Sequence, residues 1–369
     1  MSFFRTYLLP GFVFQSVVIG GGYATGRELI EFFFASGPLG GVLGLLVAGL
    51  VFGLVLAAGF EFARVAGAYD YRSFCRALLG RAWVIYEIAF VALLLLILSI
   101  IASAAGALAA SSFAVPSSIG TVLLLALTAV LTFYGADMIK RVLAGWSFLL
   151  YGVYITLFAL VLAQFGDEIG TAFTSSGGYD SWVQSGILYA GYNLAILPTV
   201  LFAVKGQSSR REALGSGMIA GAIAVVPAIL FFVALMALYP EISAAAIPSA
   251  ALMSALQMPV LGLIFQIVIF GTFVETGTAL LHAVNERVNS TMNEAGQQMP
   301  QFARPVIAVS AIAIAMVAGT QLGITALIAK GYNFLTIVFI CVLVLPLLLK
   351  CAWLMSQKKA GAQNPSAVK

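Results

Sequence analysis

Charged residues are scarce in this sequence. Asp, Glu, Lys and Arg together make up 9% of its 369 residues, whereas hydrophobic residues make up 62%. Soluble domains carry about 25% charged residues. A soluble core could not hide this much apolar surface, so the composition excludes a soluble globular protein and predicts an all-α integral membrane protein. The net charge of +4 gives no indication of nucleic-acid binding.

Cysteine and histidine are almost absent. The three cysteines, Cys75, Cys341 and Cys351, follow no metal or disulfide spacing, and we interpret them as packing residues. The single histidine, His282, is more typical of a structural residue than of a ligand. No His/Glu metal motif, Ser–Lys pair or His–Asp relay occurs at a useful depth, so we expect neither an enzyme nor a cofactor.

Long apolar runs dominate instead, and ten of them could each cross about 30 Å of hydrocarbon. They cover residues 8–34, 38–66, 82–112, 117–135, 141–166, 182–205, 212–238, 258–285, 304–321 and 332–355. The segment YDYRSFCRALLGR (69–81) predicts a short amphipathic helix at the membrane surface, ending near Gly80. We expect one transmembrane domain over residues 1–356 and a disordered cytoplasmic tail over 357–369.

Charge and repeats set the expected topology. With the N-terminus in the cytoplasm, cytoplasmic segments hold 16 of the 18 Lys and Arg residues, a positive-inside bias that predicts ten spans with both termini inside. QSVVIGGGY (15–23) also matches QSGILYAGY (184–192) at an offset of 169 residues. Because the first span runs outward and the sixth inward, we predict a 5+5 inverted repeat of residues 8–166 and 182–355.

Both matched segments carry helix breakers. The first has Gly20–Gly22, and the second has Gly191, Asn193 and Pro198, which frees a backbone carbonyl near Leu194. Unwound backbone is tolerated in a membrane only where it is buried in protein or lines a wet cavity. Helices 1 and 6 broken at matching places are typical of a transporter site. Close helix packing at the glycine triplet is the alternative, and it is what Gly49/Gly53 and Gly217/Gly221 predict.

The breaks define the predicted substrate site. We expect the second half of span one to begin near Tyr23 and to offer N–H groups to an anionic group, while freed carbonyls suit Na⁺ or an ammonium. Ser99 and Ser103 either line the cavity or bond to the backbone of their own helix. The predicted substrate-binding residues are Gly20, Gly21, Gly22, Tyr23, Thr25, Ser99, Ser103, Tyr192 and Asn193.

Ionisable residues within the spans extend the site. Arg27 and Glu31 lie one turn apart on the outer half of span one, and Glu28 lies on a neighbouring face. These three residues predict an outer gate, with a local ion pair near the outer surface as the alternative.

The predicted ion-coupling residues are Gly20, Tyr23, Thr272, Glu275 and Thr276. The last three share one helical face of span eight. Their oxygens beside the carbonyls of span one predict a Na⁺ site at Thr272 and Thr276, or a proton on Glu275. A pair between Glu275 and an arginine at the cytoplasmic side is the remaining interpretation.

Three motifs carry a family resemblance. IGGGYATGRELIEFF, the GYN of span six and the FVETGTAL of span eight resemble the YkvI-like bacterial membrane proteins. The broken 5+5 repeat looks like the LeuT-type fold of the amino acid–polyamine–organocation superfamily. This resemblance implies a substrate site between spans 1, 3, 6 and 8, and an ion between the first break and span eight. Glu275 departs from the pattern of the sodium-coupled members, so both Na⁺ and H⁺ stay open.

The sequence therefore predicts a secondary active transporter, a symporter coupled to Na⁺ or H⁺. Its expected substrate is a small polar solute, an amino acid or a related carboxylate-bearing metabolite, moved by alternating access. A membrane sensor that binds a solute without transport is the alternative, and broken helices at the midplane favour an occluded site over an open channel. The expected surroundings are the lipid bilayer of a bacterial cytoplasmic membrane, with the oligomeric state left open.

Overall fold

The structure, a computed structural model, describes residues 2–134, 136–175, 180–294, 296–300 and 302–353. Every regular element in these residues is helical, as the sequence predicts. The α-helices are α1 (Leu9–Val18), α2 (Gly21–Ala24), α3 (Arg27–Phe33), α4 (Gly37–Ala66), α5 (Tyr71–Leu79), α6 (Trp83–Phe113), α7 (Ser117–Tyr134), α8 (Ala136–Ser175), α9 (Trp182–Asn193), α10 (Leu197–Val200), α11 (Arg210–Leu235), α12 (Pro248–Ala255), α13 (Pro259–Glu294), α14 (Ala303–Ala326) and α15 (Asn333–Phe339).

Short 3-10 or π turns connect or extend these helices. They are η1 (Phe4–Leu8), η2 (Phe34–Ser36), η3 (Gly80–Ala82), η4 (Leu194–Ile196), η5 (Leu201–Val204), η6 (Met236–Leu238), η7 (Glu241–Ala244), η8 (Leu327–Tyr332) and η9 (Ile340–Val344). The predicted tail at 357–369 lies outside the described residues.

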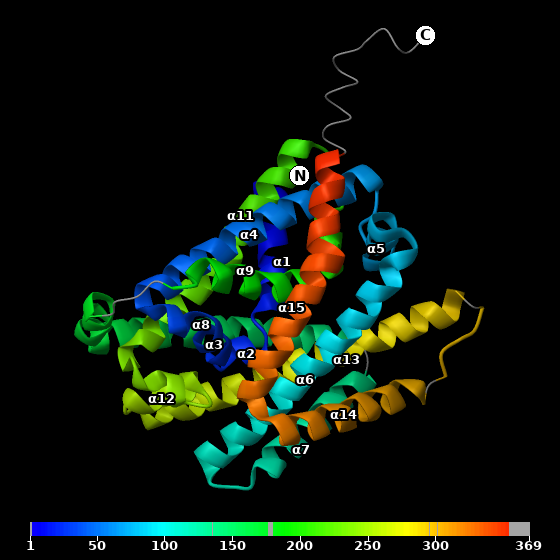
Figure 1. Ribbon diagram of the computed structural model, residues 1–369. Helices are drawn as coiled ribbons and strands as arrows, with labels where there is room; N and C mark the ends of the chain where they lie inside the picture. The colour runs from blue at the N-terminus through cyan, green and yellow to red at the C-terminus, as the bar shows by residue number, and fades with distance from the viewer. Residues whose placement is uncertain (1, 135, 176–179, 295, 301, 354–369) are drawn as a thin grey trace, which may run out of the picture.

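The first span is interrupted twice. Helix α1 ends at Val18, and the next residue, Ile19, has a ψ of 71°, which is not helical. One helical turn, α2, follows, and then Gly26 adopts a left-handed φ of +76° before α3 begins. Only glycine adopts that backbone conformation without strain. In Figure 1 the three pieces follow one another through the middle of the bundle.

Span six is also interrupted, in a milder way. Helix α9 ends at Asn193 and passes through the 3-10 turn η4 into the single turn α10, which contains Pro198. Proline has no N–H to donate and cannot continue the regular hydrogen-bond ladder. The structure therefore places interruptions in both helices where the sequence predicts them.

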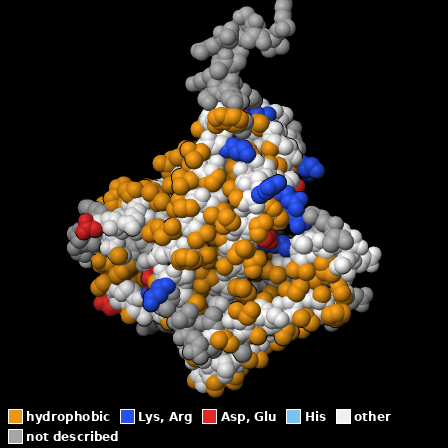
Figure 2. Space-filling model, turned by 45° about the vertical axis from the view of Figure 1, so that its right-hand side comes forward, with side chains coloured by type: hydrophobic (Ala, Val, Ile, Leu, Met, Phe, Trp, Pro, Cys, Tyr) orange, Lys and Arg blue, Asp and Glu red, His pale blue; other side chains and the backbone are white. Residues whose placement is uncertain are grey.

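Seven helices among the described residues are long and apolar enough to cross a membrane. They cover Arg27–Ala66, Tyr71–Phe113, Gly152–Thr174, Trp182–Val204, Arg210–Leu238, Pro259–Asn293 and Leu327–Trp353. Two shorter apolar helices lie at Ser117–Thr132 and Val306–Ala315. The count of ten spans and the 5+5 repeat stay predictions. Figure 2 shows apolar side chains spread over the middle of one face, with most of the visible Lys and Arg side chains gathered toward its upper right.

Helix α5 confirms the predicted amphipathic segment and its end at Gly80. The Asp70 side chain caps its first turn by accepting from the backbone N–H groups of Arg72 and Ser73. At the other end, Lys350 Nζ donates to the Ala77 carbonyl at 2.5 Å, a favourable place for a cation at a helix C-terminus. The capping lysine ties α5 to the apolar span Leu327–Trp353.

Helices α4 and α11 pack closely through glycines on both partners (Figure 1). A Cβ atom on Gly221 would lie 2.5 Å from the carbonyl oxygen of Gly49, and one on Gly49 would lie 2.7 Å from Val225 Cγ1. A Cβ on Gly53 would lie 3.3 Å from Met218 Sδ, and one on Gly217 would clash with the Ala57 backbone. These contacts confirm the packing role predicted for both glycine pairs.

We expect Gly221→Ala to lower the apparent Tm of the purified protein, because overpacking of a close contact costs about 1–3 kcal/mol. The matched control is Gly262→Ala on α13, where a Cβ would meet nothing within 4 Å. Alanine is the better helix former, so the control should keep or raise the Tm. Equal melting temperatures for the two variants would contradict the close packing of α4 on α11.

Candidate substrate and ion site

A cavity of about 480 Å³ lies beside the breaks in both interrupted helices. Its wall is largely apolar and includes Phe90, Leu93 and Ile97 of α6. Its lining residues come from α1 and the first break, from α3, α6, α9 and α13, and from the turns η4, α10 and η8. The lining residues with polar side chains or glycine are Ser16, Gly20, Gly22, Glu28, Tyr192, Asn193, Thr199, Glu275, Thr276 and Tyr332.

The interrupted backbone of span one is held by hydrogen bonds from several elements. The Thr25 hydroxyl donates to the Gly22 carbonyl at 2.6 Å, and the Gly26 N–H donates to the Tyr23 carbonyl at 2.8 Å. The Tyr154 hydroxyl, on α8, donates to the Ala24 carbonyl at 2.5 Å. The Ser249 N–H, on α12, donates to the Thr25 carbonyl at 2.9 Å. These hydrogen bonds fix the conformation of the break. The helix resumes at Gly21, whereas the sequence predicts a start near Tyr23.

A tyrosine also supports the break in span six. The Tyr86 hydroxyl on α6 donates to the Ala195 carbonyl at 2.6 Å, and Thr199 donates to the Ile196 carbonyl at 2.6 Å. Asn193 donates from its side-chain amide to the Tyr189 carbonyl at 2.9 Å. The freed carbonyls thus have partners, as backbone groups within a membrane require.

Glu28 lines the cavity and contacts α9 and η8. Its carboxylate accepts hydrogen bonds from the Tyr192 hydroxyl at 2.7 Å and from the Tyr332 hydroxyl at 3.1 Å. The two tyrosine rings stack at a centroid distance of 4.1 Å and an interplanar angle of 8°. Glu28 is 4% exposed, and its carboxylate lies so close to Gly22 that a Cβ there would overlap it. Glu28 thus bonds to two elements distant in the sequence.

The three residues predicted as a gate do not act together in the structure, because Glu28 makes different contacts from Arg27 and Glu31. Arg27 pairs with Glu31 at 3.0 Å and donates to the carbonyls of Ser243 and Ala245 at 2.8 and 3.3 Å. These contacts tie α3 to the segment before α12. Glu28 points into the cavity instead, because the left-handed turn at Gly26 sets which face of α3 meets it.

Of the predicted ion-coupling residues, Thr276 lies against the first break. A Cβ on Gly20 would lie 3.9 Å from Thr276 Oγ1. Glu275 lines the same cavity. Thr272 is 1% exposed, lies outside the cavity lining, and donates to the Val268 carbonyl of its own helix at 2.9 Å. The structure thus brings Gly20, Glu275 and Thr276 together and places Thr272 one turn away.

Several predicted substrate residues lie outside the cavity lining. Ser99 donates to the Leu95 carbonyl at 2.7 Å, which is the backbone-bonding alternative, and Ser103 does not line the cavity either. Thr25 is fully buried, and its hydroxyl donates to the Gly22 carbonyl within the break. Tyr332, by contrast, lines the cavity although no sequence pattern predicts it. An intramembrane tyrosine close to Lys330 is too common a feature to mark a site.

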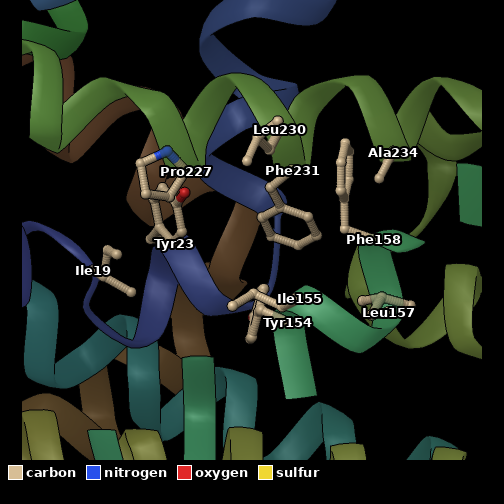
Figure 3. Close-up of a pocket in the computed structure, with 10 residues that line it drawn as sticks. All are labelled: Ile19, Tyr23, Tyr154, Ile155, Leu157, Phe158, Pro227, Leu230, Phe231 and Ala234. Atoms are coloured by element: carbon tan, nitrogen blue, oxygen red, sulfur yellow. The ribbon is translucent and has the colours of Figure 1, made fainter. Parts of the chain in front are cut away.

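Tyr23 faces a second, apolar cavity of about 320 Å³ on the other side of the break. Figure 3 shows its lining, which comes from the break, from α8 and from α11. Tyr23 and Phe231 contact each other there at a centroid distance of 6.0 Å. Two cavities with largely apolar walls therefore adjoin the interrupted segment, and the larger one also carries the carboxylates of Glu28 and Glu275.

Solved structures identify the fold of the protein. A Na⁺-coupled sialic acid symporter in a substrate-bound outward-open state matches with a TM-score of 0.63 at 15% identity, covering 91% of this chain and 79% of that one. MhsT in complex with L-phenylalanine matches with a TM-score of 0.60 at 17% identity, covering 95% and 87%. At these identities the likeness establishes the fold, which is that of the LeuT-type transporters. The two proteins are transporters rather than enzymes.

A sequence relative agrees with this fold. The chain is a distant homologue of the membrane protein YkvI of Bacillus subtilis (strain 168). The two are 25% identical over 291 residues, which cover 76% of this chain and 80% of YkvI. No protein-family model matches the sequence.

Gly22→Ala should abolish ligand binding to the cavity, because its methyl group would displace the Glu28 carboxylate from both tyrosines. Gly20→Ala is the matched control, since its methyl group would meet nothing closer than 3.7 Å. Ligand-induced thermal stabilisation measures both variants. Equal loss in the two would mean that the glycines matter for helix unwinding and not for the position of Glu28.

Proposed function

We propose that the protein is an ion-coupled secondary transporter of a small polar solute, an amino acid or a related carboxylate-bearing metabolite. The observation that carries the proposal is the cavity between two interrupted helices, lined by the first break and by polar side chains of other elements. Broken helices that meet at a buried cavity are typical of transporter sites. The likeness to symporters of solved structure supports the same function.

The proposed topology has ten spans in a 5+5 inverted repeat, with both termini inside a bacterial cytoplasmic membrane. The positive-inside distribution of Lys and Arg supports it. In this topology Arg27 and its partners close the outer end of the bundle, and the cavity extends toward the cytoplasmic half of α1 and α13. The described state is then closed to the outside.

The proposed mechanism is alternating access, in which spans 1, 2, 6 and 7 rock against spans 3, 4, 8 and 9. Opening the outer end would break the contacts of Arg27 with the carbonyls of Ser243 and Ala245. The coupling ion, Na⁺ or H⁺, would bind beside Gly20, Glu275 and Thr276, on the same interrupted segment that receives the solute. An ion that orders this segment lowers the cost of binding the solute, and the coupling is reciprocal.

The function is tested first by a thermal-shift screen of the purified protein against amino acids and small carboxylates, with and without Na⁺. A stabilising compound is then offered to proteoliposomes under an inward Na⁺ gradient or an inward proton gradient. The proposal expects uptake above that of protein-free liposomes under one gradient. Stabilisation without uptake under any gradient would contradict transport and indicate a sensor.

If Na⁺ is the coupling ion, Thr276→Ala should raise the Na⁺ concentration for half-maximal uptake about tenfold. That factor is the equivalent of about 1.4 kcal/mol for one lost oxygen ligand. Thr276→Ser keeps the hydroxyl and should stay near the wild type. An unchanged Na⁺ requirement in Thr276→Ala would remove this residue from the site.

If a proton is the coupling ion, Glu275→Gln should remove the dependence of uptake on the proton gradient while leaving counterflow of the solute intact. The reason is that glutamine keeps the shape of the side chain but cannot bind and release the proton. Uptake by Glu275→Gln that still follows the proton gradient would exclude Glu275 as the carrier.

A further inference from the structure

We propose that Glu28 recognises a cationic amino group on the solute, so that the cavity selects ammonium-bearing compounds over carboxylates without an amino group. The inference rests on the proposed function and names the chemistry of its substrate. It assigns Glu28 to the solute and leaves Gly20, Glu275 and Thr276 to the coupling ion.

The first argument is that the Glu28 carboxylate is buried and forms no ion pair. The residue is 4% exposed and lines the cavity, and its oxygens are held by the hydroxyls of Tyr192 and Tyr332. Among the ion pairs of the described residues, none includes Glu28. A carboxyl group this buried is costly to ionise without a cation beside it, and an ammonium group on the solute would supply that cation.

The second argument is that nearby cations are engaged elsewhere. Arg27 is the next residue in the chain, but its guanidinium bonds to Glu31 and to two carbonyls on the outer side. Arg287 lies behind Phe90, 4.1 Å from the centroid of that ring, and pairs with Glu87 at 3.2 Å. No basic side chain is found in the cavity lining that the described residues provide.

The third argument is the surroundings of the carboxylate. The hydroxyls of Tyr192 and Tyr332 contact it, and a tyrosine oxygen can accept a hydrogen bond from an ammonium group while its O–H donates to the carboxylate. Gly22 leaves room for the carboxylate on the interrupted backbone, at the place where the solute is expected. A solute with only a carboxylate would meet the charge of Glu28 in a poorly solvated cavity, where like charges repel strongly.

The test measures the charge that the cavity presents, and it can be carried out before the solute is identified. Ala279, an exposed residue of the cavity lining, is replaced by cysteine in a chain whose Cys75, Cys341 and Cys351 are changed to serine. Two methanethiosulfonate reagents are compared, one with a trimethylammonium group and one with a sulfonate group. The ratio of their reaction rates is divided by the same ratio for free 2-mercaptoethanol.

We expect the corrected ratio to favour the cationic reagent by about tenfold or more, as in other clefts lined by one sign of charge. Glu28→Gln should lower this preference, and Glu275, which lines the same cavity one turn from Ala279, accounts for the part that remains. Glu31→Gln, the same change one turn along α3 and outside the cavity lining, should keep it. A ratio near one, or above one for the sulfonate, in the Ala279→Cys protein with native Glu28 would overturn the proposal, whether or not Glu28→Gln folds.

Repeating the measurement in NaCl and in N-methyl-D-glucamine chloride of equal ionic strength separates a solute site from an ion site. A preference that persists in NaCl supports the assignment of Glu28 to the solute. A preference that Na⁺ abolishes would assign the carboxylate to the coupling ion and overturn the proposal. The reagent ratio does not depend on transport. The role of Glu28 can therefore be contradicted while uptake is observed, and uptake can be absent while the reagent preference is present.

Discussion

The pairing of backbone groups in the interrupted first span is the constraint on which the rest of the structure depends. Within a membrane, an unpaired N–H or C=O group costs several kcal/mol. The carbonyls of Gly22, Tyr23, Ala24 and Thr25 meet this requirement through Thr25, Gly26, Tyr154 and Ser249. Partners from α8 and α12 are therefore part of the break, although both are distant in the sequence. These bonds pair the carbonyls that the interruption of the helix frees. The interrupted backbone can therefore line the cavity.

The same break determines the electrostatics of the cavity. The left-handed turn at Gly26 redirects the chain before α3, so that Arg27 and Glu28 face opposite environments. Arg27 bonds to the segment before α12, and the Glu28 carboxylate lines the cavity and accepts hydrogen bonds from Tyr192 and Tyr332. Two neighbouring residues that follow one glycine, Arg27 and Glu28, thus have different surroundings. Any movement that opens the outer end would also act on the segment that holds Glu28.

The features that the sequence predicts well depend on local composition. Apolar runs mark the helices, Asp70 and Gly80 mark the ends of α5, and the glycines and Pro198 mark the breaks. The features it misses depend on the direction of side chains after a break. The place of Glu28 follows from the φ of one glycine, and Tyr332 reaches it from 304 residues away. Ser99 fits a cavity-lining pattern equally well, but its hydroxyl bonds to its own helix.

The central claim, alternating access around this break, is tested most directly by a distance measurement at the outer end. Spin labels at Leu39→Cys on α4 and Ser254→Cys on α12, both exposed, report the separation of the two sides by pulsed electron resonance in a cysteine-free background. The account predicts two distance populations, the shorter one matching the closed state described here. Their ratio should change with Na⁺ or with pH. A single distribution that neither condition alters would contradict alternating access.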